Sequence, residues 1–140
     1  MNEVGLMEQR FRILASNIGP AEAAAKALAA GAARTRAKYA GVDIHEMTQA
    51  TSLREMFRAW HWELEFDEEG NVCAVEGPTC GKTGDEKVLF DVVAPFVEEG
   101  SYIQIIYDED NSIWRWTFRD GKCAETKARL VFDEGARVPT

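Results

Sequence analysis

The stretch Trp60-His-Trp-Glu-Leu-Glu-Phe-Asp-Glu-Glu-Gly-Asn71 divides the sequence into two parts with different hydrophobic periodicity. Before it, apolar residues recur every three or four positions, as on an amphipathic helix. From Trp62 to Phe66 the apolar residues alternate with Glu63 and Glu65, as on a half-buried strand. The Asp-Glu-Glu-Gly-Asn run is typical of a turn, so this stretch predicts a hairpin whose return strand covers residues 72–76.

The same boundary separates two charge regimes. Residues 1–60 contain eight Lys/Arg and six Asp/Glu, which gives a net charge of +2. Residues 61–140 contain eight Lys/Arg and eighteen Asp/Glu, which gives −10, and the two parts sum to the −8 of the chain. The acidic pI of about 4.8 argues against direct binding to nucleic-acid phosphates. It fits a well-solvated protein or one that docks on a basic partner. With 140 residues and 46% hydrophobic residues, we expect one compact domain.

The distribution of charged residues and cysteines favours a cytoplasmic protein. Four charged residues between Glu3 and Arg12 leave no uncharged signal segment, and no run approaches the roughly 18 apolar residues of a membrane span. Cys73, Cys80 and Cys123 are odd in number and lack the close spacing of structural zinc ligands. We therefore expect reduced thiols, no metal, no cofactor and no membrane association.

The first 60 residues are expected to be helical. Val4, Met7, Phe11, Leu14 and Ile18 form a helical seam, which predicts a first helix that ends at Gly19-Pro20. An alanine-rich second helix is predicted over residues 21–40, with Gly41 as its C-terminal cap residue. Because its side chains are small, its backbone must approach a neighbour closely, either the first helix or its own copy in a homodimer.

Ser52-Leu-Arg-Glu55 has the pattern of a capping box and predicts a short helix through Met56, Phe57 and Trp60. Residues 85–99 predict a further helix, distorted at Pro95 and stopped by Gly100.

Three strands are predicted at residues 102–107, 113–118 and 123–132, the last two joined by a hairpin turn at Asp120-Gly121. The fold class is therefore α+β. N-terminal helices (1–60) precede an acidic ββαβββ unit (61–133), whose antiparallel sheet has about five strands and helices on one face. Trp114, Trp116 and Phe118 should face the core. The other face should carry a mixed polar lattice made of Glu63, Glu65, Arg115, Thr117, Glu125, Lys127 and Arg129.

No catalytic motif is evident. Gly77-Pro-Thr-Cys-Gly81-Lys-Thr83 resembles a phosphate-binding loop, but it has three residues between its glycines where the Walker motif has four, and Pro78 removes one N–H. A small-ligand or nucleotide site in the 77–84 loop is therefore an alternative hypothesis. Neither His45 nor His61 has an identifiable nucleophile beside it, so we do not expect an enzyme.

Several segments between residues 60 and 125 resemble small uncharacterised proteins of bacteria, their phages and mobile elements. They are the Trp60–Asn71 stretch, Leu89-Phe-Asp-Val-Val-Ala-Pro-Phe-Val, Gly100-Ser-Tyr-Ile and Trp114-Arg-Trp-x-Phe followed by Gly121-Lys-Cys. The resemblance implies no particular activity. It implies an accessory protein of a mobile element, a class whose members often bind and block a host protein.

These observations lead to the hypothesis of a non-catalytic, protein-binding inhibitor, in its most concrete form an anti-defence protein of the anti-CRISPR sort. Acidic patches would occupy a basic surface of a nucleic-acid-handling host protein by steric block or mimicry. The candidate patches are Asp67, Glu68 and Glu69, then Glu98 and Glu99, then Asp108, Glu109 and Asp110. Arg34, Arg36 and Lys38, at the end of the alanine-rich helix, form a candidate basic docking surface. A scaffold that self-associates through this helix is the other alternative.

Overall fold

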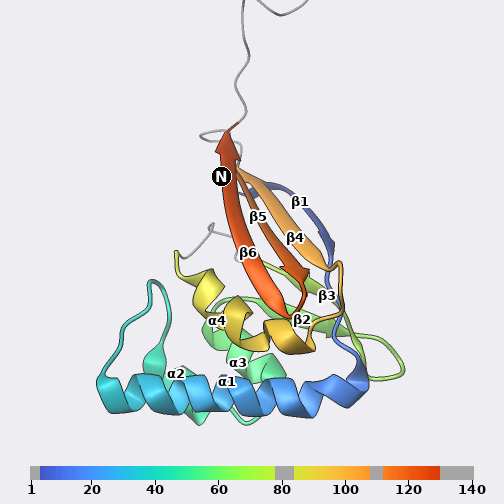
Figure 1. Ribbon diagram of the computed structural model, residues 1–140. Coiled ribbons are helices and arrows are strands. Elements are labelled where there is room, and N and C mark those ends of the chain that lie inside the picture. Colours follow the sequence, from blue (N-terminus) through green and yellow to red (C-terminus); the bar gives the residue numbers. More distant parts are fainter. Residues whose placement is uncertain (1–3, 78–83, 108–111, 130–140) are drawn as a thin grey trace, which may run out of the picture.

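The computed structural model describes residues 4–77, 84–107 and 112–129, which form a helical base with a β-sheet standing on it (Figure 1). The helices are α1 (Ala15–Thr35), α2 (Ile44–Gln49), α3 (Leu53–Ala59) and α4 (Glu86–Val93), with a 3-10 turn η1 (Ala94–Phe96). The strands are β1 (Val4–Arg10), β2 (Glu63–Phe66), β3 (Val72–Glu76), β4 (Tyr102–Tyr107), β5 (Ser112–Arg119) and β6 (Lys122–Arg129). The α+β class is confirmed.

The described strands form two antiparallel sheets rather than one. Strands β1-β4-β5-β6 form the larger sheet in that order, and β2-β3 form a separate hairpin. The two sheets meet at β3, where Ile13 makes a backbone bridge to Val72. Close by, the Gln9 side-chain amide donates to the Val75 carbonyl and accepts from the Val75 N–H at 2.9 Å. The segment around β1 therefore joins the hairpin to the larger sheet.

The predicted first helix is wrong, because Val4–Arg10 is strand β1. It pairs with β4 in a register that runs from Val4 opposite Tyr107 to Arg10 opposite Tyr102. Beyond β1 the chain stays extended, and Phe11 and Ile13, two positions apart, are both buried. The helical spacing of the apolar residues was thus coincidental, since pairing with a strand more than 90 residues away determines the local structure.

The alanine-rich helix begins before Gly19-Pro20 and ends before Gly41. Pro20 lies near the N-terminal end of α1, where it removes one backbone hydrogen bond without ending the helix. The helix ends at Thr35, and Arg36 takes the left-handed conformation (φ 60°) expected of a glycine. Its buried stripe of alanines packs within the chain, chiefly against α4, α2 and α3. The stripe consists of Ala21, Ala25, Ala29 and Ala32.

Several local predictions are confirmed. The Ser52 hydroxyl accepts from the Glu55 N–H at 3.2 Å at the start of α3, although the Glu55 carboxylate accepts from Thr51 rather than from Ser52. Helix α4 passes into the 3-10 turn that contains Pro95. Asp120 and Gly121 both have positive φ (55° and 73°), as a two-residue hairpin turn of type I′ requires.

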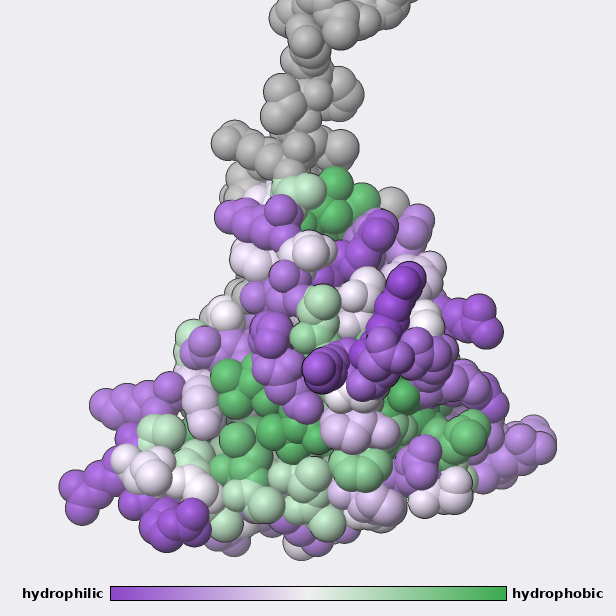
Figure 2. Space-filling view, viewed as in Figure 1, coloured by the Kyte–Doolittle hydropathy of each residue, from purple (hydrophilic) through white to green (hydrophobic). Residues whose placement is uncertain are grey.

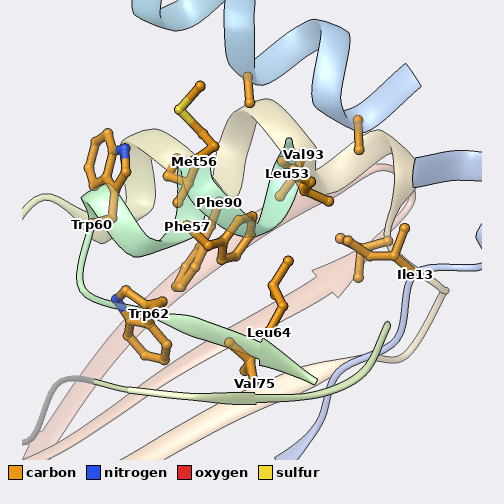
Figure 3. Close-up of a cluster of buried hydrophobic side chains, with 14 of the residues drawn as sticks. Ile13, Leu53, Met56, Phe57, Trp60, Trp62, Leu64, Val75, Phe90 and Val93 are labelled. Carbon is orange, nitrogen blue, oxygen red and sulfur yellow. The ribbon is translucent and has the colours of Figure 1, made fainter. Parts of the chain in front are cut away.

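The core is aromatic and centred on Phe90 of α4 (Figure 3). Its ring centroid lies 5.3 Å from those of both Trp62 and Trp116 and 6.0 Å from that of Phe118, in edge-to-face contacts. Trp62 directly precedes β2, and Trp116 and Phe118 lie in β5, so Phe90 packs both sheets against the helices. Gly77 lies against the Trp62 ring, where an added Cβ would come within 3.1 Å of the indole.

The larger sheet has one covered face and one open face, but the predicted polar lattice is only partly correct. Glu63 and Glu65 belong to the separate hairpin, and Glu125 and Lys127 lie on the side of the larger sheet opposite to that expected. The register places Glu125 opposite Trp116 and Lys127 opposite Trp114, so both lie on the covered face. Glu125 accepts from the Trp116 indole N–H at 2.8 Å, and the Lys127 ammonium lies 5.1 Å from the centre of the Trp114 ring. The two-residue turn fixes this register, so the sequence contained the signal.

Candidate functional surfaces

The turn of the β2-β3 hairpin is organised by Asp67. Its Oδ1 accepts from the backbone N–H groups of Glu69 and Asn71, both at 2.9 Å, and its Oδ2 accepts from Asn71 Nδ2 at 3.0 Å. These hydrogen bonds, that of the Asn71 side chain foremost, lower the pKa of Asp67. Asn71 Oδ1 in turn accepts from the Ala15 N–H at 2.7 Å and caps α1, whose own N-cap residue Leu14 has no capping oxygen. Asp67 therefore serves the fold.

Two more of the predicted acidic residues also have partners within the chain. Glu98 Oε1 lies 3.5 Å from Arg12 Nε, and Glu99 Oε1 accepts from the Asp120 N–H at 2.8 Å. Glu63, on the hairpin, accepts two hydrogen bonds from Arg58, at 2.8 and 3.1 Å. These bonds lower the pKa of Glu63. Carboxylates engaged in this way are poorly placed to attract a partner.

The outer face of the hairpin and its turn carry carboxylates that form no ion pair within the described structure. Glu65, Glu68 and Glu76 are exposed, and no basic side chain in the described part of the chain forms an ion pair with any of them. Cys73 is exposed on the same hairpin, where it is the extra residue of a β-bulge: Glu65 pairs with Ala74 and Phe66 with Val72. We call Glu65, Glu68 and Glu76 the hairpin carboxylates. Glu68 belonged to a predicted patch, whereas Glu65 and Glu76 did not.

The basic end of α1 is exposed at all three predicted residues, Arg34, Arg36 and Lys38. Arg34 borders a shallow hollow of about 610 Å³ that lies between α1 and α2 and is lined mainly by alanines, Met47 and Thr48. Figure 2 shows apolar surface over the helical base and hydrophilic surface over the sheet above it.

The open face of the larger sheet contains a polar hollow of about 190 Å³. It is lined by Glu8, Gly100, Ser101, Tyr102, Arg115, Thr117 and Arg119. The Arg115 guanidinium is held in place by Gln104, whose Oε1 accepts from both Nε (2.8 Å) and Nη2. Gln104 itself is only 8% exposed, so Arg115 is bonded to a fixed part of the sheet.

The cysteines and histidines of the described structure do not form a site. Cys73 is exposed on the hairpin, whereas Cys123 is buried, and burial raises the pKa of its thiol to about 12. His61 Nε2 forms a 2.6 Å hydrogen bond with the Gly41 carbonyl, which fixes the loop after α1. Among the described residues, no group of three or more His, Cys, Asp or Glu side chains could hold a metal ion.

Some predicted site residues lie outside the described residues: Asp108, Glu109 and Asp110, and positions 78–83 of the 77–84 loop. Among the described helices, none has both the length and the apolar character needed to cross a membrane. No protein-family model, curated protein or solved structure matches this chain.

Proposed function

We propose that this chain is a non-catalytic, protein-binding module that inhibits a partner with a basic surface by steric block or acidic mimicry. The observation that carries the proposal is the set of hairpin carboxylates, Glu65, Glu68 and Glu76, which are exposed and free of described ion-pair partners. An unpaired carboxylate can bind a cationic partner without first breaking an internal ion pair. Such charges raise the association rate, and salt weakens their effect.

The hairpin that carries these carboxylates is held in place by core packing and hydrogen bonds. The core holds its inner face through Leu64 and Val75, which are 1% and 0% exposed. Its turn is held by Asp67 and joined to α1 through Asn71. A surface that is ordered before binding loses little conformational entropy when it docks, which favours affinity.

In its most concrete form, the proposal is an anti-defence protein of a mobile element whose target is a nucleic-acid-handling host protein. Two features support this form: the net charge of −8 on a chain of 140 residues, and the resemblance of the Trp60–Asn71 and Trp114–Phe118 stretches to small mobile-element proteins. A basic channel that normally binds phosphates would be the complementary surface.

The test is capture of partners from bacterial lysate at low and high salt, followed by quantitative mass spectrometry. Glu65→Lys/Glu68→Lys should lose a salt-sensitive partner that the unmodified chain retains at low salt. Glu46→Lys/Asp91→Lys is the matched control, because both pairs change the net charge from −8 to −4 at exposed positions. Equal capture by both variants would contradict a docking role for the hairpin carboxylates.

A further inference from the structure

The open face of the larger sheet has a charge opposite to that of the whole protein. By the strand registers, the described ionisable residues on this face are one acid, Glu8, and four bases, so the face carries +3 on a chain of −8. The four bases are Arg10, Arg115, Arg119 and Lys122. Among the described residues, no carboxylate forms an ion pair with Arg115 or Arg119.

We propose that the hollow on this face is a binding site for a single oxyanion, the phosphate or carboxylate group of a small ligand. Arg115 and Arg119 contribute two guanidinium groups, and Tyr102, Thr117 and Ser101 contribute hydroxyl groups around the same hollow. A planar guanidinium is suited to bidentate binding of either anion. At about 190 Å³ the hollow is smaller than the roughly 300 Å³ at which pockets for drug-sized ligands begin, so it fits one anionic group.

Gln104 preorganises the principal guanidinium of this site. Its Oε1 accepts two of the five N–H groups of Arg115 and leaves three for a ligand. Gln104 is nearly buried in β4. Ser101, which directly precedes β4 and is 3% exposed, accepts from the Arg12 N–H at 3.2 Å, so its own hydroxyl proton can be donated to a ligand. The anion would thus meet donors that are already in position.

Glu8 is the one carboxylate that lines the hollow among the described residues, and it gives the proposal a test of opposite sign to that of the arginines. Its carboxylate lines the same hollow and opposes an anion there, because like charges repel in a partly desolvated site. Removal of this charge should strengthen binding, whereas removal of either arginine should weaken it. A general effect of net charge on a nonspecific surface would not depend on which residue of the face is changed.

The experiment is an NMR titration of the full chain with inorganic phosphate and, in a separate arm, with acetate, both at constant ionic strength maintained with chloride. The expected result is saturable shifts confined to the open face, including the Arg115 Nε–H. Arg115→Gln and Arg119→Gln should each raise the dissociation constant about tenfold, the effect of losing a charged hydrogen bond. Glu8→Gln should lower it. The arm with the tighter saturation identifies phosphate or carboxylate as the preferred group.

Lys122→Gln is the matched control, since it removes one positive charge from the same face outside the hollow. It should change the dissociation constant by less than about twofold, because the screened charge lies on the exposed rim. Shifts that never saturate in either arm, or equal weakening by Lys122→Gln and Arg119→Gln, would overturn the proposal. If Arg115→Gln fails to fold, the exposed Arg119→Gln and Glu8→Gln variants, with their opposite expected signs, still decide it.

Discussion

The Gln9 side chain forms the two hydrogen bonds to Val75 that the backbone of a neighbouring strand would otherwise form. Its replacement gives a quantitative test of how the two sheets are joined. The Val75 N–H and carbonyl point away from β2, and the Gln9 amide forms hydrogen bonds with both. Val75 is 0% exposed, so Gln9→Leu would leave a donor and an acceptor without partners next to the core. Each unsatisfied buried group costs about 1–3 kcal/mol.

Gln9 is only half-buried, so water can reach part of the vacated site, and we expect the lower part of the range. The predicted loss is about 2–4 kcal/mol in the free energy of unfolding. It can be measured by urea denaturation followed by tryptophan fluorescence, which reports on the buried Trp60, Trp62 and Trp116. Glu8→Gln, on the opposite face of β1, should change stability by less than about 0.5 kcal/mol. A loss below about 0.5 kcal/mol for Gln9→Leu would refute the joining role.

Three further predictions concern the core, a helix end and acid stability. Phe90→Ala should lower the free energy of unfolding by about 3–5 kcal/mol, because it removes the ring that contacts both sheets; a loss under about 1 kcal/mol in chemical denaturation would contradict this. Arg36→Gly should raise thermal stability by up to about 1 kcal/mol, since glycine adopts the left-handed conformation without strain; a lower melting temperature would contradict it. Folding lowers the pKa of Asp67 below its ordinary 3.8, chiefly through the hydrogen bond from the Asn71 side chain. The ionised Asp67 therefore stabilises the fold fully above pH 3.8, and this contribution is lost as the pH falls through the folded pKa. Asp67→Asn should therefore show a smaller loss of stability on acidification than the unmodified chain, and an unchanged pH profile would count against this.

Much of the fold from Ser52 onward follows from local sequence. The alternation around Leu64, the capping pattern at Ser52 and the Asp120-Gly121 turn each encode their structure within a few residues, and all three were predicted correctly. The same turn also determines which face of the sheet Glu125 occupies. Where short-range chemistry decides the structure, the sequence is sufficient.

Strand β1 and helix α1 depend on contacts that local sequence does not contain. Val4–Arg10 forms a strand because β4 pairs with it, and α1 begins at Ala15 because Asn71 caps it from the hairpin. The candidate site was likewise only partly predictable. Acidic composition pointed to Asp67 and Glu68 alike, but only three-dimensional structure shows that Asp67 bonds its own turn while Glu68 is exposed. Residue type gives the charge, and packing decides whether the charge is free.

The most direct test of the proposed function is thiol alkylation of Cys73 on the captured complex, read by peptide mass spectrometry. Cys73 is exposed on the same hairpin, next to the residue that pairs with Glu65, and the buried Cys123, with its pKa raised to about 12, is an internal control that should react slowly in every sample. If a partner covers the hairpin, alkylation of Cys73 should be slow in the low-salt complex and fast after release at high salt. Equal rates for Cys73 in the free and the partner-bound chain would contradict docking through this hairpin.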